Sequence, residues 1–113
     1  MAGEKRVFYC VFRPDKLKST EEMRALFETS YPKFLDMDAV EFKCWWCDQE
    51  KQEWGGFYVF KSEEALQEYV ASDHWQNVAP EKYGCVPTWV SLEVGAIVSK
   101  KVIKSFEGSW RDE

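Results

Sequence analysis

The stretch VEFKCWWCDQEKQEWGGFYVF, residues 40–60, decides the fold. It predicts two strands joined by a polar turn at 48–53, as in an exposed hairpin loop. Side chains along a strand point alternately to its two faces. In the first strand one face is apolar, and the other mixes charged and aromatic side chains (Glu41, Lys43, Trp45 and Cys47). Such a mixture is typical of a covered face that holds a polar cavity, so the rest of the chain must supply the cover.

The segments before this hairpin predict a strand and a helix. The strand candidate Arg6–Arg13 is apolar on both alternating faces, which indicates a central position in a sheet. Ser19 and Glu22 have the spacing of a capping box, which opens a helix. Pro32 is predicted to end or bend this helix near Tyr31. The apolar stripe of the helix consists of Met23, Leu26, Phe27, Tyr31 and Phe34.

The segments after the hairpin predict a second helix and a last strand. The helix begins at Ser62 and buries Ala65, Leu66, Tyr69 and Val70. A short irregular or helical piece at 72–83 and a strand at 87–98 follow. The order strand–helix–strand–strand–helix–strand predicts an α+β, ferredoxin-like βαββαβ domain over residues 1–98, with a four-stranded antiparallel sheet and both helices on one face. The tail, 99–113, is charged but carries apolar residues, and we expect an arm that packs on the domain or on a partner subunit.

One sheet face stays bare in such a fold. We expect the uniformly apolar sets to face the helices (Val40, Phe42, Cys44 and Trp46 in one strand; Val90, Leu92 and Val94 in another). The bare face would then present Lys43, Trp45, Tyr58 or its neighbour Phe57, Ser91 and Glu93. Trp45 and Trp89 would make it an apolar patch, which usually marks an interface. Nucleic-acid bases or a second subunit are two ways to cover it.

Composition argues against nucleic acid as the cover of the bare face. The formal net charge is −5 and the pI about 5.0, whereas binding to nucleic acid or anionic lipid needs a basic patch. Residues 53–60 superficially resemble the third-strand signature of RNA-recognition motifs, but they begin with an acidic residue and their two glycines are adjacent. The start is too charged for a signal peptide, and no apolar run reaches the roughly 18 residues of a membrane span. We therefore expect a cytoplasmic protein that binds neither nucleic acid nor membrane.

The cysteines do not predict a metal or redox site. Cys44 and Cys47 have a familiar spacing, but residues three apart in a strand point to opposite faces. A zinc site would also need ligands from among Cys10, Cys85 and the lone His74. We expect buried free thiols and no metal.

A family resemblance supports a second subunit as the cover of the bare face. Lys43-x-Trp45, a polar turn, Gly55-Gly56-x-Tyr58-x-Phe60, then Ala65-Leu66 and Tyr69 resembles the YdhR-like monooxygenases of the dimeric α+β-barrel superfamily. Residues 60–75 are similar to the related antibiotic-biosynthesis monooxygenases. The resemblance implies a homodimer whose sheets face each other and enclose cavities. It also implies oxygenation of an aromatic or polyketide-like small molecule without metal or flavin. Haem-degrading relatives need an axial histidine near 78–80, where this chain has none.

The candidate site residues follow from these patterns. His74 and Lys43 are the candidate catalytic residues, as base or substrate-orienting groups, because oxygen chemistry without a cofactor begins by removing a substrate proton. Trp45 and Tyr58 are candidate stacking walls, and Tyr69, Trp89 and Glu93 further candidate substrate contacts. A structural role remains open for each of these residues. His74 would be a helix-end histidine, Lys43 and Glu93 an ion pair across the sheet, and Trp45 and Tyr58 anchors of the dimer. A non-catalytic dimeric ligand-binding module is the alternative function.

Overall fold

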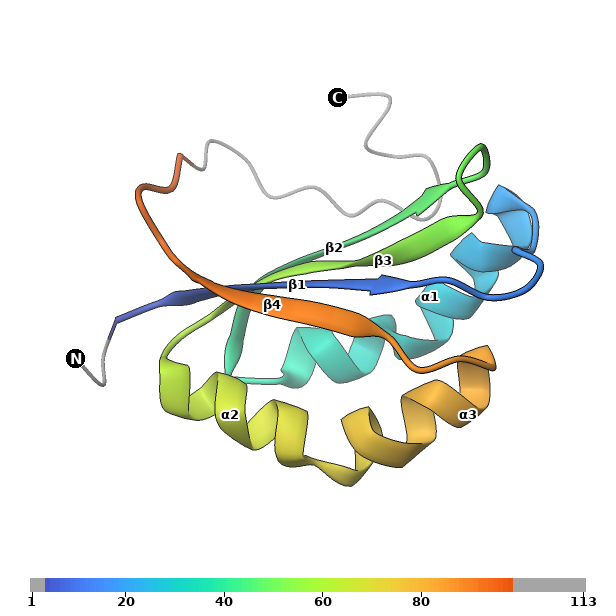
Figure 1. Cartoon of the computed structure of the whole chain (residues 1–113). Helices are drawn as coiled ribbons and strands as arrows, with labels where there is room; N and C mark the ends of the chain where they lie inside the picture. Colours follow the sequence, from blue (N-terminus) through green and yellow to red (C-terminus); the bar gives the residue numbers. More distant parts are fainter. Residues whose placement is uncertain (1–3, 99–113) are drawn as a thin grey trace.

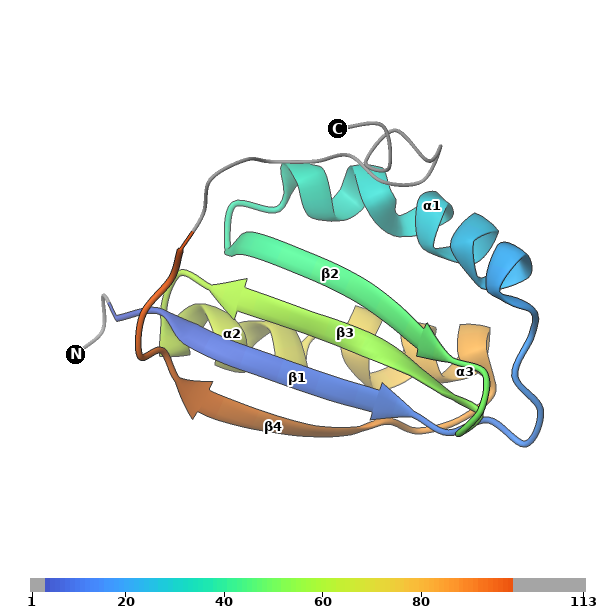
Figure 2. The same ribbon diagram turned by 90° about the horizontal axis from the view of Figure 1, so that it is seen from above.

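The order of strands and helices is the predicted one. The computed structural model describes residues 4–98. Its elements are β1 (Arg6–Phe12), α1 (Thr20–Asp36), β2 (Val40–Asp48), β3 (Glu53–Phe60), α2 (Glu63–Ala71), the π-helical turn η1 (His74–Val78), α3 (Ala79–Tyr83) and β4 (Thr88–Glu93). The strands form one antiparallel sheet in the order β2-β3-β1-β4, with the helices on one of its faces (Figure 1, Figure 2). The ferredoxin-like arrangement is confirmed.

The C-terminal end of the domain differs slightly from the prediction. β4 stops at Glu93 rather than near Val98, because its pairing partner β1 begins at Arg6, directly opposite Glu93. The predicted arm, 99–113, lies outside the described residues, so the domain boundary at 98 stays a prediction. Within residues 4–98 no helix is long and apolar enough to cross a bilayer.

Helix α1 begins where the sequence predicts and ends later. The Ser19 hydroxyl accepts a hydrogen bond from the Glu22 N–H at 3.1 Å, and the Glu22 carboxylate accepts one from the Ser19 N–H at 3.2 Å. This is the predicted capping box. Pro32 does not end the helix, which continues to Asp36. The extra turn matters because it carries Phe34, a wall of the cleft described below.

The two adjacent glycines of β3 allow close packing within the sheet. A Cβ on Gly55 would lie 2.0 Å from the carbonyl oxygen of Cys10 in β1, a distance that no side chain tolerates. A Cβ on Gly56 would lie 2.7 Å from the Tyr58 ring. The glycines therefore permit a close approach of backbone and rings.

The assignment of the two sheet faces was wrong, and the structure reverses it except at Val40, which lies before a β-bulge and packs on the core as predicted. Lys43, Trp45 and Tyr58 lie under the helices: the Lys43 ammonium sits over the Phe34 ring of α1, and Tyr58 contacts Tyr69 of α2. The mixed face is thus the covered one. It tolerates burial because its polar atoms bond to one another while rings and the lysine stem supply apolar surface.

The face away from the helices is apolar. Trp46 stacks on Tyr9 there, with ring centroids 5.9 Å apart. The large exposed side chains of this face come from all four strands: Tyr9, Phe42, Phe57, Val90 and Leu92. Figure 1 shows that no described helix covers it. A contiguous apolar patch of this kind marks an interaction surface.

Cysteine placement follows the same alternation. Cys44 and Cys47 point to opposite faces, as residues three apart in a strand must. Cys10 is buried, Cys47 and Cys85 are partly buried against the core, and Cys44 is exposed. The expectation of buried thiols therefore holds fully for Cys10 alone and is wrong for Cys44. Its exposure follows from the reversed faces. All four cysteines are free.

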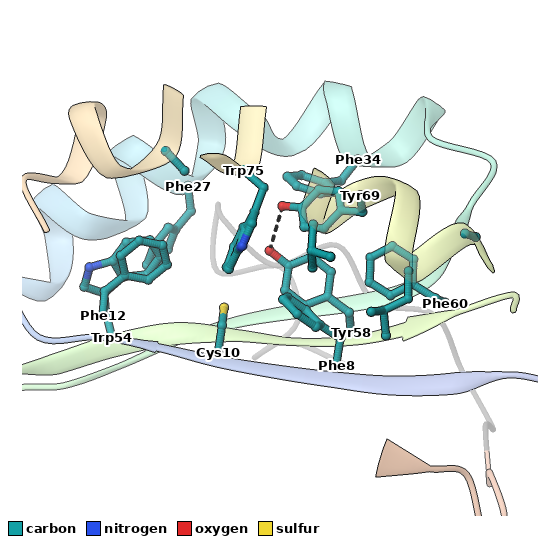
Figure 3. Close-up of a cluster of buried hydrophobic side chains, with 14 of the residues drawn as sticks. Phe8, Cys10, Phe12, Phe27, Phe34, Trp54, Tyr58, Phe60, Tyr69 and Trp75 are labelled. Atoms are coloured by element: carbon teal, nitrogen blue, oxygen red, sulfur yellow. Dashed lines mark hydrogen bonds between the residues drawn. The ribbon is translucent and has the colours of Figure 1, made fainter. Parts of the chain in front are cut away.

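The core between sheet and helices is built from aromatic rings (Figure 3). Phe8 lies at its centre, edge-on to Tyr58 at 5.0 Å and to Trp75 at 5.2 Å between ring centroids. Phe12 stacks on Trp54 at 4.1 Å. Such ring pairs add about 0.5–1.5 kcal/mol each beyond the area they bury. The ring framework therefore holds the side chains around the cleft in fixed positions.

Candidate functional site

A narrow cleft opens between the sheet and the helices α1, η1 and α3. Counted out to its open mouth, it contains about 330 Å³ of empty space. Its apolar lining consists of Phe12, Phe34, Trp45, Trp54, Trp75, Gly56 and Ala79. Its polar lining consists of Ser30, Lys43, Tyr58, Tyr69, His74 and Tyr83. Among residues 4–98 no group of three carboxylate, thiol or imidazole side chains is gathered that could hold a metal ion.

Lys43 is the central polar group of the cleft. β2 places it opposite Tyr58 of β3, and its ammonium donates a hydrogen bond to the Tyr58 hydroxyl at 2.7 Å. The ammonium nitrogen lies 3.4 Å from the ring centroid of Phe34, 4.4 Å from that of Trp45 and 4.2 Å from that of Tyr58. Gly56 makes room for the ring of this tyrosine, since a Cβ there would lie 2.7 Å from the Tyr58 ring.

The environment of Lys43 shifts its protonation. Burial lowers the pKa of Lys43 well below its usual value, and the positive charges of Lys33 and Lys82 lower it further. The surrounding ring faces act in the opposite direction, because the aromatic quadrupole attracts a cation. Lys43 therefore exchanges a proton closer to neutral pH than an exposed lysine does, as proton-transfer catalysts require.

The hydrogen-bond chain continues from Lys43 into the core. The hydroxyls of Tyr58 and Tyr69 lie 3.3 Å apart and point toward one another (Figure 3). Burial raises the pKa of both hydroxyls, so both are protonated at neutral pH. Tyr69 belongs to the predicted buried stripe of α2, all four residues of which are buried. The two tyrosines fix the position of the lysine amine and can pass a proton to or from it.

His74 lies at the turn from α2 into η1. Its ring centroid is 6.0 Å from that of Tyr69 and 6.1 Å from that of Phe34. Burial, helped by the charges of Lys33, Lys43 and Lys82, lowers the pKa of His74 to about 4. The imidazole is consequently neutral at pH 7, and it can accept a hydrogen bond from a ligand hydroxyl.

The structure gathers most of the candidate site residues in this cleft. Lys43, Trp45, Tyr58, Tyr69 and His74 all line it. They lie beneath the helices, however, and not on the bare sheet face where the sequence had placed the first three. Their roles in binding or catalysis stay predictions.

Two candidates fall outside the cleft. Glu93 lies on β4 opposite Arg6, and β4 and Lys43's strand β2 are the two edges of the sheet, so the predicted Lys43–Glu93 ion pair was wrong. Trp89, also on β4, packs on Phe8 with ring centroids 5.4 Å apart and is 40% exposed.

Several lining residues were not predicted as part of a site. Phe34 was assigned only to the stripe of α1, and Tyr83 to an irregular segment. Ser30, Trp54 and Trp75 carried no signal in the sequence beyond their residue types. They meet only because α1, β3 and η1 converge on one end of the sheet.

The sequence match to a known family covers this site. The profile of the family described as putative mono-oxygenase ydhR matches residues 14–84, which is more than half of the chain's 113 residues. The chain belongs to this family. The ydhR match includes every lining residue of the cleft except Phe12. No curated protein matches the sequence of this ydhR-family chain.

Solved structures share the fold of the ydhR-family chain at low sequence identity. A protein of unknown function from Nitrosomonas europaea, NE2512, is 11% identical with a TM-score of 0.64, over 90% of this chain and 100% of that one. A variant of SnoaB from Streptomyces nogalater, a cofactor-independent oxygenase, is 9% identical with a TM-score of 0.60, over 86% and 99%. The monooxygenase from the gene ActVA-Orf6 of Streptomyces coelicolor, in complex with Nanaomycin D, is 14% identical with a TM-score of 0.61, over 86% and 94%.

Proposed function

We propose that this ydhR-family chain is a mono-oxygenase that oxidises an aromatic or polyketide-like small molecule without a metal or organic cofactor. One observation carries the proposal: the Lys43 amine is held 2.7 Å from the Tyr58 hydroxyl inside a cleft walled by aromatic rings. Membership of the mono-oxygenase family supports it. The shared fold with a cofactor-independent oxygenase is consistent with it.

The chemistry assigned to Lys43 is proton transfer. In oxygenation of this kind the substrate loses a proton, and the resulting electron-rich anion passes electrons to O₂. For a ring methylene the balance is R₂CH₂ + O₂ → R₂C=O + H₂O. An unprotonated Lys43 takes the proton, and the ammonium it becomes then holds the anion by a charge-assisted hydrogen bond. The depressed pKa of Lys43 makes the first half of this cycle accessible near neutral pH.

The other residues orient the substrate in this proposal. The neutral imidazole of His74 accepts a hydrogen bond from a substrate hydroxyl. Trp45, backed by the stacked ring of Phe27 at 5.7 Å, is a rigid wall for a flat ligand. Tyr58 is the second wall and, with Tyr69, the fixed partner of the lysine.

The cleft is narrow, which sets a requirement on binding. The space inside it that a water-sized sphere can occupy is about 20 Å³, far below the about 300–1,000 Å³ of small-molecule sites. A two-ring ligand therefore enters only if a lining side chain gives way. The flexible stem of Lys43 is the side chain that can move at least cost, because the surrounding rings are locked by their mutual packing.

We also propose that the chain forms a homodimer through the apolar sheet face. Phe42, Phe57, Val90 and Leu92 are exposed there. The indole nitrogen of Trp46, on the same face, is buried and has no hydrogen-bond partner among the residues described. A second copy of the face covers the apolar side chains and supplies acceptors at the seam.

Oxygen uptake tests the enzymatic proposal. Wild-type protein is mixed with a panel of anthrones and hydroquinones in an oxygen electrode, and products are identified by mass. Lys43→Met should reduce turnover at least about 100-fold, the usual contribution of a positioned base. Lys51→Met, in the exposed β2–β3 turn, is the matched control and should leave turnover unchanged. A wholly inert panel, or full activity in Lys43→Met, contradicts the proposal.

A non-catalytic ligand-binding module is the second candidate. The observation that favours it is the pKa of His74, about 4, at which an imidazole is a weak base near neutral pH. Binding of panel compounds without oxygen uptake would establish this alternative.

A further inference from the structure

Two lysines stand next to residues that line the cleft, although the chain as a whole is acidic. Ser30 and Phe34 of α1 line the cleft, and Lys33 lies between them on the same face, three residues after the first. Ala79 and Tyr83 of α3 line it from the other side. Lys82 stands in the equivalent position, three residues after Ala79. Each helix therefore presents one lysine directly beside its lining residues.

Lys82 connects the two helices beside the cleft. Its ammonium donates hydrogen bonds to the hydroxyls of Thr29, at 2.8 Å, and Ser30, at 3.3 Å. Hydroxyl groups orient an ammonium but do not neutralise its charge. Both Lys33 and Lys82 are exposed at their ends, so a ligand can reach them.

The charges at the mouth and inside the cleft act on one another. Burial lowers the pKa of Lys33, and the positive charge of Lys82 lowers it further. Burial likewise lowers the pKa of Lys43 and of His74, and both lysines add to that shift. The positive charges of Lys33 and Lys82 beside one cleft favour a negatively charged ligand. The net charge of −5 would by itself repel such a ligand. The positive charge of the two lysines therefore makes this part of the surface selective for negatively charged ligands.

We propose that the ligand of this cleft is an aromatic acid, whose ring enters between the aromatic walls and whose carboxylate is held at the mouth by Lys33 and Lys82. The proposal rests on the cleft being the ligand site and does not require that oxygenation occurs. It narrows the substrate class to rings that carry a permanent acidic group on the side opposite the reacting hydroxyl.

A matched ligand pair tests the proposal. Binding of 2-naphthoate and of 2-naphthylmethanol is measured by titration calorimetry under nitrogen, so that no turnover contributes. We expect the wild-type protein to bind the acid at least about fivefold more tightly, since one exposed ion pair is worth up to roughly 1 kcal/mol and two lysines take part. Raising the salt concentration should weaken binding of the acid and leave that of the alcohol unchanged.

Variants locate the effect. The double variant Lys33→Gln, Lys82→Gln should bind both compounds equally, because glutamine can still form hydrogen bonds but carries no charge. Lys51→Gln, remote in the β2–β3 turn, should keep the preference. Equal affinities in the wild type, no binding of either compound, or a preference that survives the double variant would overturn the proposal. A retained preference without oxygen uptake would overturn only the enzymatic function.

Discussion

Replacing Lys43 by methionine should increase the stability of the fold while abolishing its activity. Methionine matches the unbranched stem, so the packing against Phe34 and Trp45 is kept. The variant loses the hydrogen bond to Tyr58, worth about 1 kcal/mol, and the cation–ring contacts, worth about 1–2 kcal/mol together. The Tyr58 hydroxyl keeps Tyr69 as its partner.

The stability gained by Lys43→Met comes from removing a buried charge. Placing an ammonium among rings costs several kcal/mol of hydration, which methionine does not incur. The balance predicts a net increase of about 1–2 kcal/mol in the free energy of unfolding. Urea unfolding followed by tryptophan fluorescence should show a midpoint about 0.5–1 M higher.

Two outcomes separate a functional lysine from a structural one. Lys43→Ala, which also removes the stem, should be destabilised by about 1–3 kcal/mol and serves as the packing control. If Lys43→Met is itself destabilised by more than about 1 kcal/mol, the ammonium is a structural group held by its rings. The reasoning that a buried amine is kept for chemistry at a cost in stability would then be refuted.

Two further predictions concern the pH response and the bare sheet face. Because the pKa of His74 is about 4 in the fold and 6.5 in the unfolded chain, the unfolded chain binds more protons between these values, and stability should fall as pH drops from 6.5 towards 4. His74→Gln should show a smaller loss in urea titrations at pH 6.5 and 4.5; identical losses would contradict the shift. Phe57→Arg, on the apolar face, should convert the homodimer to a monomer in light scattering, whereas Leu35→Arg, on the exposed side of α1, should not. A wild-type monomer at micromolar concentration would refute the dimer proposal.

The sequence was a good guide to the elements and their order. Ser19 and Glu22 marked the start of α1, and the stripe of α2 was found residue by residue, because capping and helical periodicity are local properties. The alternation in β2 correctly separated its two faces from Phe42 onward, but it missed the β-bulge that puts Val40 on the core side. Period-two patterns, however, say nothing about which face the helices cover.

The reversed faces explain the other errors. An apolar strand face suits a helix layer and a partner subunit equally, so Phe42 and Leu92 were assigned to the wrong side. Lys43 looked like a group for a bare face because its charge was weighed and its apolar stem was not. Whether Glu93 can pair with Lys43 depends on the order of the strands, which only the folded sheet fixes.

A structure with a bound aromatic ligand tests the central claim that the cleft beneath the helices is the functional site. Crystals grown with 2-naphthoate, or with any compound that supports oxygen uptake, should show the ring between Trp45 and Tyr58, with the Lys43 side chain moved aside. Density on the apolar sheet face, or between two such faces, with an unchanged cleft would contradict the account.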